Sequence, residues 1–290
     1  MRKNFNGGTV FDIANVVFFL LLAVVMIYPF WNILMTSLVS NDEYLSRPVI
    51  LWPKEFVFKS YETIFENKLM VRSFFNSVFI TVVGTIYSML MTVMLAYGLS
   101  KDNLMWGKFF RVFVIITMYF SGGLIPYYML IRNLELRDTI WVLILPMAIN
   151  AWNYIIVRAF FKQLPEGLDE AAKIDGANDI MILFRIMLPI SAPVLATFSL
   201  FYGVEYWNSW WYSLLFITDS SLFPLQYVLR ELVLVNATVA SKALSAGGMN
   251  MFDQGIKMAT VVVATVPILC VYPFLQKYFT KGVTLGAIKE

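Results

Sequence analysis

The sequence predicts an all-α protein, a polytopic membrane helix bundle with six transmembrane helices. Hydrophobic residues make up 59% of the chain and charged residues only 14%, and the mean hydropathy is +0.70. Six apolar segments are long enough to cross a bilayer, which takes about 20 helical residues. A short polar stretch separates two of them. We therefore expect an integral membrane protein with a single domain over residues 1–290.

The predicted spans follow one another with polar or glycine-containing connections. Their approximate bounds are 11–38, 73–99, 109–131, 139–161, 188–216 and 256–279. The first is too long for the apolar core of a signal peptide, which has about 7–15 residues, and it has no convincing small-residue cleavage site, so we expect it to be retained. An even number of spans places both termini on the same side of the membrane.

Polar and glycine residues interrupt the third and fourth spans. The run Ser121-Gly122-Gly123-Leu124-Ile125-Pro126 predicts a kink with exposed carbonyl groups in the third span. The fourth contains Asn150, Trp152 and Asn153. Because an Asn in a membrane helix usually finds a hydrogen-bond partner on a neighbouring helix, we favour a structural role there. A substrate contact by Asn153 stays open as the alternative.

Between the fourth and fifth spans the sequence predicts a helix-turn-helix over residues 162–189. Pro165 suits the start of a helix, and the three carboxylates among residues 166–170 place negative charge at its positive end. Asp175 and Gly176 indicate a turn, because Gly tolerates a positive φ. Asn178 is suited to begin the second helix. The apolar residues expected to face the spans recur at helical spacing: Ile180, Leu183, Ile186 and Met187.

This segment also carries a spaced motif. It reads EAA, three residues, Gly, nine residues, Ile, one residue and Leu-Pro, with every defined position present: Glu170, Ala171, Ala172, Gly176, Ile186, Leu188 and Pro189. The pattern resembles the coupling loop of permease subunits in binding-protein-dependent ABC importers. The resemblance implies a cytoplasmic loop that docks into a groove on an ATP-binding subunit. Small residues at the bend permit close approach, and Glu170 and Asp175 are placed to meet Arg or Lys of the partner.

The fifth span is unusually rich in aromatic and polar groups, from Phe201 to Tyr212 (FYGVEYWNSWWY). A carboxylate at this depth costs about 2.5–3.5 kcal/mol on insertion scales, so Glu205 should face a cavity or a partner. Aromatic faces and polar side chains suit a sugar pathway, and the candidates are Glu205, Tyr206, Trp207 and Asn208. The alternative is an aromatic belt at the outer interface, which we favour for residues 210–212.

After the fifth span, residues 218–250 are expected outside the membrane. They contain Pro224, an amphipathic LQYVLRELVLV run and the small residues Ser245-Ala246-Gly247-Gly248. We predict a short interfacial helix that faces a partner or the outer leaflet.

Composition excludes most enzyme chemistry. The chain has no His and one Cys, Cys270, inside an apolar run, so a disulfide framework, a Cys/His zinc site and His-based catalysis are excluded within it. A phosphate-binding GxxxxGK[ST] loop is missing as well, so a separate subunit must hydrolyse any ATP. The net charge of +3 is too small and dispersed for a nucleic-acid footprint. We therefore expect no catalytic, cofactor-binding or metal site in this chain.

Basic residues favour a cytoplasmic N-terminus mildly. With both termini and the 101–111 and 158–185 regions on one side, that side holds twelve of the 22 basic residues: Arg2, Lys3, Lys101, Lys108, Arg111, Arg158, Lys162, Lys173, Arg185, Lys277, Lys281 and Lys289. The coupling-loop resemblance decides the orientation, because ATP-binding subunits are cytoplasmic. It implies a multi-pass protein of the bacterial cytoplasmic membrane with both termini in the cytoplasm.

The whole chain resembles the carbohydrate-uptake permeases of type I ABC importers. It is similar to the second permease of the maltose system and more similar still to the group for complex or polymer-derived saccharides. The resemblance is carried by the coupling loop and by residues 120–146, 201–217 and 281–290. It implies the type I importer permease fold, a homologous second permease in a heterodimer, two ATP-binding subunits that hold ATP and Mg, an extracytoplasmic solute-binding protein and an oligosaccharide substrate. An importer of another solute class, such as peptides, polyamines or phosphate, is the main alternative. A secondary transporter and an intramembrane enzyme are the remaining ones.

Overall fold

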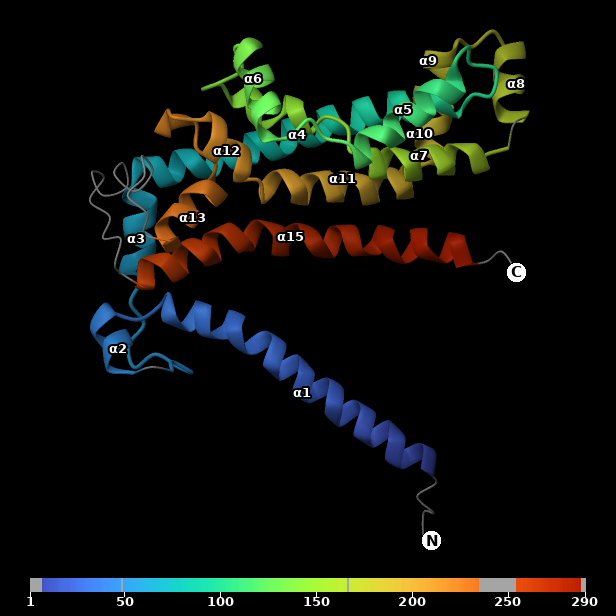
Figure 1. Cartoon of the computed structure of the whole chain (residues 1–290). Helices are drawn as coiled ribbons and strands as arrows, with labels where there is room; N and C mark the ends of the chain where they lie inside the picture. Colours follow the sequence, from blue (N-terminus) through green and yellow to red (C-terminus); the bar gives the residue numbers. More distant parts are fainter. Residues whose placement is uncertain (1–6, 48, 166, 235–253, 288–290) are drawn as a thin grey trace.

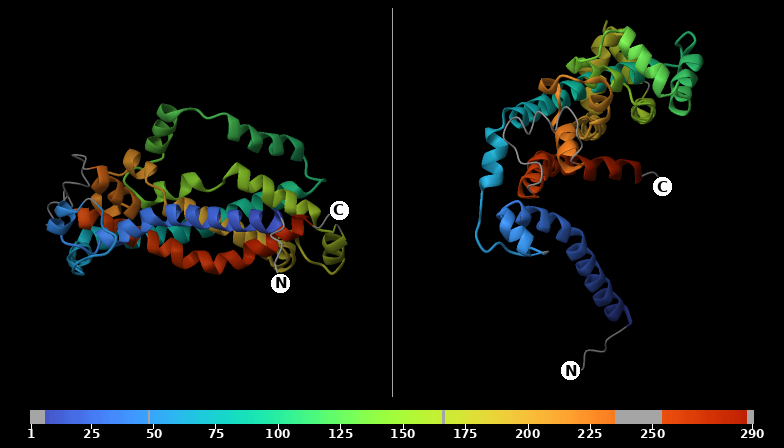
Figure 2. Two further views of the ribbon diagram at one scale, coloured as in Figure 1. Left: turned by 90° about the horizontal axis from the view of Figure 1, so that it is seen from below. Right: turned by 60° about the vertical axis from the view of Figure 1, so that its left-hand side comes forward.

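The computed structural model describes residues 7–47, 49–165, 167–234 and 254–287, which contain helices and loops but no strand. The longer helices run along a common direction (Figure 1). One end of the molecule, the loop end, carries α8 (Gly167–Ile174) and α9 (Asp179–Ile182). The first turns of α1 and the last turns of α15 point toward the same side in both figures (Figures 1 and 2). The opposite end is called the far end below.

The six predicted spans appear as three long helices and three bent pairs. The long helices are α1 (Gly7–Thr36), α4 (Lys68–Ser100) and α15 (Gln254–Ala287), and each contains a stretch apolar and long enough to cross a membrane. The first bent pair is α5 (Gly107–Tyr119) with α6 (Leu124–Asn133). In the second, the short helices η1 (Ile140–Leu143) and η2 (Leu145–Met147) precede α7 (Ala151–Gln163). In the third, α9, η3 (Leu183–Met187) and α10 (Leu188–Ile190) follow one another and precede α11 (Ala192–Trp207).

The bends have local causes in the sequence. The axes of α5 and α6 differ by 116°, and the connection contains Gly123 at φ +85°, so the predicted kink is confirmed. The break before α7 is 47°, and there the side chain of Asn150 accepts hydrogen bonds from the N–H groups of Trp152 (3.0 Å) and Asn153 (3.3 Å). This amide therefore caps α7. Its role is structural, as predicted, but these partners lie on α7 itself and not on a neighbouring helix.

The fifth predicted segment, 188–216, is divided into shorter helices. A bend of 88° separates α10 from α11, and α11 ends at Trp207. The side chain of Asn208 donates to the carbonyl of Val204 (2.9 Å), and α12 (Trp211–Phe216) follows after a short break. Beyond it lie η4 (Ser220–Leu222) and α13 (Leu225–Leu234). Thus the short helix predicted for the LQYVLRELVLV run is present, whereas residues 245–248 lie outside the described residues.

The packing of α11 against α4 forms the centre of the bundle. The buried face of α4 repeats a small residue roughly every fourth position: Ser73, Ser77, Gly84, Ser88 and Thr92. This leaves room for two tyrosines of α11, whose hydroxyls form hydrogen bonds with Ser88 (Tyr206, 2.8 Å) and Thr92 (Tyr202, 2.7 Å). Small residues and interhelical hydrogen bonds are the usual means of helix association in lipid, where water does not drive it.

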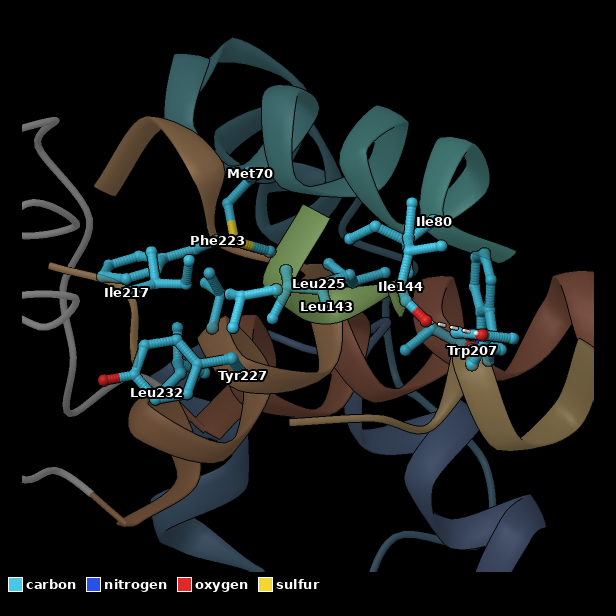
Figure 3. Close-up of a cluster of buried hydrophobic side chains, with 14 of the residues drawn as sticks. Met70, Ile80, Leu143, Ile144, Trp207, Ile217, Phe223, Leu225, Tyr227 and Leu232 are labelled. Atoms are coloured by element: carbon cyan, nitrogen blue, oxygen red, sulfur yellow. Dashed lines mark hydrogen bonds between the residues drawn. The ribbon is translucent and has the colours of Figure 1, made fainter. Parts of the chain in front are cut away.

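The far end is filled by apolar and aromatic side chains. In Figure 3 residues from α4, η1, α11 and the α12–α13 region converge, and a dashed line marks the hydrogen bond from the Tyr206 hydroxyl to the Ile144 carbonyl (3.0 Å). Helix η1 contributes Val142 and Leu143, and Ile144 follows between η1 and η2; all three are at most 1% exposed. The short helices α2 (Asn41–Ser46) and α3 (Lys59–Glu66) lie at this end as well (Figure 1).

Helix α1 differs from the other spans. None of its membrane-length apolar stretch is buried, and its body diverges from the bundle in Figure 1 and in the right-hand view of Figure 2. The helix is held near its end, where Trp31 Nε1 donates to the carbonyl of Leu51 (2.9 Å), Met35 and Thr36 are buried, and α1 packs against α15. A helix that is apolar on all sides requires either lipid or another protein around it.

Candidate coupling loop and transport pathway

The predicted helix-turn-helix is present at the loop end. Helix α8 ends at Ile174, and Gly176 has φ +84°, a left-handed conformation that favours glycine. The side chain of Asn178 accepts a hydrogen bond from the N–H of Met181 (2.8 Å) and so caps α9. Both the turn and the restart therefore occur at the predicted residues.

The loop is attached to the spans by a buried apolar cluster. Ala172 (6% exposed) and Ile182 (0%) pack with Tyr97 of α4 and Phe161 of α7. Of the four residues predicted to face the spans, Leu183 and Met187 are buried and Ile186 is half-buried.

The prediction for Ile180 is wrong, because this side chain is 70% exposed. The segment Leu183–Met187, η3, is a π-helix with a wider turn, and it changes the helical register that the spacing assumed. As a result Ile182 takes the buried position, and Ile180 lies on the outer side.

Asp169 is the centre of an ion-pair network that joins α8 to the end of α4. Its carboxylate forms an ion pair with Lys101, accepts a hydrogen bond from the Tyr97 hydroxyl (3.3 Å) and lies 3.9 Å from the ammonium of Lys173. Lys173 in turn lies 3.4 Å from the carboxylate of Asp179, on the second helix of the loop. These contacts hold the two helices of the loop together and to α4.

A second set of contacts closes the end of α4. The carbonyl of Leu99 accepts hydrogen bonds from Arg158 Nε (2.8 Å) and from Arg111 (3.4 Å), and cations are favoured at a helix C-terminus. The ammonium of Lys162 donates a hydrogen bond to the Asp102 carboxylate and forms an ion pair with it. This hydrogen bond holds the pKa of the Asp102 carboxyl below its usual value. The ends of α4, α5 and α7 are thereby tied together beneath the loop.

A cavity of about 310 Å³ lies between the loop and these helix ends. Its walls include the Lys101–Asp169 and Lys162–Asp102 pairs, together with Glu170 and Pro165.

The outer surface of the loop is open. Glu170, Ala171, Asp175 and Gly176 are exposed, and a Cβ atom placed on Gly176 would meet nothing within 4 Å. Ile174, an apolar residue that the sequence interpretation did not single out, is 86% exposed beside the turn. At the end of the motif, Leu188 is half-buried and Pro189 is exposed. The loop therefore presents a small-residue bend with carboxylates and an exposed isoleucine.

The five candidate pathway residues separate into two groups. Tyr206 (2% exposed), Trp207 (5%) and Asn153 (4%) are packed inside the chain, and Trp207 Nε1 donates to the carbonyl of Ala264 (2.9 Å). In contrast, Glu205 and Asn208 are exposed. With Phe201 they follow the spacing i, i+4 and i+7, which places them on one open face of α11.

The sequence alone gives no signal for the ion-pair network, since Lys101 and Asp169 are 68 residues apart. Within the described ranges, no group of three or more Asp, Glu, Cys or His residues is arranged to hold a metal ion.

Comparison with known proteins agrees with this architecture. No protein-family model matches the chain. Protein LplC of Bacillus subtilis is 43% identical over 286 residues, covering 99% of this chain and 97% of the relative. The polygalacturonan/rhamnogalacturonan transport system permease protein YtcP of the same organism is 43% identical over 280 residues, covering 96% and 98%.

A solved structure is also similar. A chain from a bacterial ABC transporter involved in the import of the acidic polysaccharide alginate superimposes with a TM-score of 0.85 at 30% identity, over 96% of this chain and 100% of that chain.

The helical membrane fold and the agreement with transporter subunits over nearly the full length define an ABC-importer permease. More particularly, the chain belongs to the family of carbohydrate ABC transport permeases.

Proposed function

We propose that this chain moves an oligosaccharide across the membrane after an extracytoplasmic solute-binding protein has delivered it. Two separate cytoplasmic subunits bind ATP and Mg and hydrolyse the ATP. Docking of the loop on the ATP-binding subunits is inferred mainly from the open face of the loop around Gly176. In a chain whose loop is otherwise anchored by buried Ala172 and Ile182, an exposed bend of small residues next to Glu170 suits insertion into a partner's groove.

The contacts of Asp169 support a mechanical role for this loop. A force applied by the ATP-binding subunits to α8 passes to α4 through the Asp169–Lys101 pair and the Ala172 packing, and α4 is the principal neighbour of α11. Closure of the ATP-binding subunits thus tilts α4 together with α11, the helix that carries Glu205, Tyr206 and Trp207. Ile186, Leu188 and Pro189 connect the loop to α11 directly and form the second route for this motion.

The exposed apolar surface of helix α1 is an argument for a second permease subunit. Its membrane-length stretch buries nothing within this chain, and a homologous permease offers an apolar surface to complete its packing. The open α11 face is the second element that requires a neighbour, since the Glu205 carboxylate is costly against lipid. We place the saccharide pathway along this face, with Glu205 and Asn208 at its surface and with Tyr206, Trp207 and Asn153 supporting it from inside.

The saccharide class is supported by a relative named for polygalacturonan and rhamnogalacturonan transport and by the alginate transporter. The loop end, toward whose side the first turns of α1 and the last turns of α15 point (Figure 1), is proposed to face the cytoplasm, because the ATP-binding subunits work there. An importer of a non-sugar solute is the alternative, and uptake assays with labelled saccharides separate the two.

The proposal is tested by mass spectrometry of the complex recovered from native cells after gentle detergent extraction of a tagged copy. We expect a second permease with the EAA motif and a subunit with a phosphate-binding loop. Recovery of the chain alone, reproducibly and in stable form, would contradict the importer assembly and favour a secondary transporter.

The pathway is tested by Glu205→Gln, which removes the charge and preserves the shape of the side chain. We expect altered transport kinetics or altered assembly with the second permease. A fully unchanged phenotype would place Glu205 at an interface without a role in transport.

A further inference from the structure

At the far end, the open face of α11 continues onto α13. The side chain of Asn208 lies 3.5 Å from Gln226 Nε2, and Gln226 and Arg230 are four residues apart on one face of α13. Glu205, Asn208, Gln226 and Arg230 therefore form a continuous series of polar groups from the span to the far-end surface. We call this series the polar strip.

Arg230 is held in place on two sides. Its guanidinium lies 4.5 Å from the ring centre of Trp210, and it forms a 2.6 Å ion pair with Glu231. The side chain of Glu231 is 0% exposed, so the pair is anchored on the buried face of α13. A half-buried arginine stacked on an indole and bonded to a buried carboxylate has one preferred orientation.

The guanidinium retains hydrogen-bonding capacity in this orientation. An arginine has five N–H donors, and in the part of the chain that the structure describes Glu231 is the one acceptor bonded to Arg230. The side chain is 28% exposed, so the remaining donors are accessible at the surface of the strip. Such a fixed and partly open fork matches the two oxygens of a carboxylate.

We propose that Arg230 binds a carboxylate of the transported saccharide, so that the substrate is an acidic, uronate-containing oligosaccharide received at the far end of the pathway. This inference rests on the proposed function. The amides of Asn208 and Gln226 supply donors and acceptors for sugar hydroxyls beside the guanidinium. Glu205 lies deeper on the same strip, and its like charge keeps the anionic group at the Arg230 end.

Arg137 provides a matched control. Its guanidinium also lies over an aromatic ring, Tyr128, at 5.5 Å, but Arg137 is exposed and lies on the loop between α6 and η1. It resembles Arg230 in residue type and in stacking, and it lies off the strip. Its removal therefore controls for the loss of a positive charge stacked on an aromatic ring.

The test uses the complete importer, reconstituted in liposomes with its own binding protein and ATP. Uptake of a labelled trigalacturonide is compared with uptake of its methyl ester, which has the same sugar rings without the charge. The binding protein's own preference is common to all variants, so a change in the acid-to-ester ratio between variants reports the permease.

We expect Arg230→Gln to lower trigalacturonide uptake at least tenfold. Where uptake of the methyl ester is measurable, the acid-to-ester uptake ratio should also fall at least tenfold. Arg230→Lys keeps the charge without the fork and should fall between the two, and Arg137→Gln should match the wild type. An unchanged acid uptake and ratio in Arg230→Gln would overturn the inference, as would a loss of acid and ester uptake in equal proportion. A wild-type complex that transports neutral oligosaccharides but no uronide would also overturn the inference about Arg230, and the proposed function would stand. A wild-type complex that transports no saccharide would refute the proposed function itself.

Discussion

The two ends of the bundle are held together by different forces. At the loop end, α8 is attached to α4 by the Lys101–Asp169 ion pair, whose side chains remain partly exposed, and by Ala172. The other buried apolar contacts of the loop come from the segment after the turn, where Ile182, Leu183 and Met187 pack against the spans. At the far end, α4, η1, α11 and α13 share a large core of aromatic and aliphatic side chains with at most a few per cent exposure (Figure 3). Exposed ion pairs contribute about 0.2–1 kcal/mol each, whereas truncating a buried large side chain leaves a cavity and costs about 2–5 kcal/mol.

This difference bears on the coupling that we propose. In that proposal, α8 responds to a partner that pushes on it, because an exposed ion pair and Ala172 oppose its displacement only weakly. The tightly packed far end would then move as one body and pass the displacement along α4 and α11. The following predictions test whether the two ends differ in this way.

The largest effect is expected from Gly176→Arg at the loop end. The position has φ +84°, and no atom of this chain lies within 4 Å of an added Cβ, so a large side chain projects toward the partner. We expect uptake and transport-coupled ATP hydrolysis to be abolished while the spans still insert, as measured in reconstituted complexes.

Gly176→Asn is the matched control. Asn is among the few residues that adopt this left-handed conformation readily, and its side chain is small, so we expect measurable transport. Normal transport by the Arg variant would refute docking at the bend.

A smaller effect on transport but a clear loss of stability is expected from Gly84→Ala in the central packing. The added Cβ would lie 2.7–2.8 Å from three ring atoms of Tyr206. Overpacking of this kind costs about 1–3 kcal/mol, so the Tm of the purified complex should fall.

Gly98→Ala is the control on the same helix, because nothing lies within 4 Å of its Cβ. There the usual gain of about 0.5–1 kcal/mol for Ala over Gly in a helix should leave Tm unchanged or raised. A raised Tm in Gly84→Ala as well would contradict the close packing of α4 on α11.

The Asp169–Lys101 pair should give a modest coupling energy at the loop end. Asp169→Asn and Lys101→Met remove the same ion pair, so their effects on Tm should be less than additive by about 0.5–1 kcal/mol. The coupling should shrink as salt is added, because these side chains are partly exposed.

Asp102 and Lys162 form the comparison pair. The Asp102 side chain is 72% exposed, so its coupling to Lys162 should be smaller than that of Asp169 with Lys101. Strictly additive effects at Asp169 and Lys101 would show that the ion pair does not hold the loop.

The smallest effect is a pH dependence at the far end. Asp138 accepts hydrogen bonds from the hydroxyl and the N–H of Thr218, and these bonds hold the pKa of its carboxyl below the usual value. A lowered folded-state pKa stabilises the fold above the unfolded value of about 3.9, and the stabilisation is lost as the pH falls through the folded value.

Asp138→Asn should therefore lower Tm slightly at pH 7, and the difference from wild type should decrease as the pH falls below about 4. Thermal unfolding of the two purified complexes across this range measures it. A difference that stays constant over the whole range would contradict a role for the charged carboxylate.

Much of the architecture could be predicted from local sequence. The bend at Gly123, the turn at Gly176 and the cap at Asn178 depend on residue types that favour these conformations wherever they occur, and the structure confirms all three. Prediction failed at Ile180, because the π-helix after it changes the register. The substrate-pathway residues Glu205, Tyr206, Trp207, Asn208 and Asn153 stay a prediction, with two exposed and three packed.

The sequence by itself determined the membrane class, the apolar segments and the coupling motif, because hydropathy and spacing act over neighbouring residues. Only the tertiary structure decided that Lys101 meets Asp169, that Gly84 makes room for Tyr206, and that Arg230 of the polar strip contacts both Trp210 and Glu231. The first two contacts join residues far apart in the chain, and the third depends on the direction in which α13 returns to α11. Side-chain neighbours of this kind follow from helix packing, which no local pattern specifies.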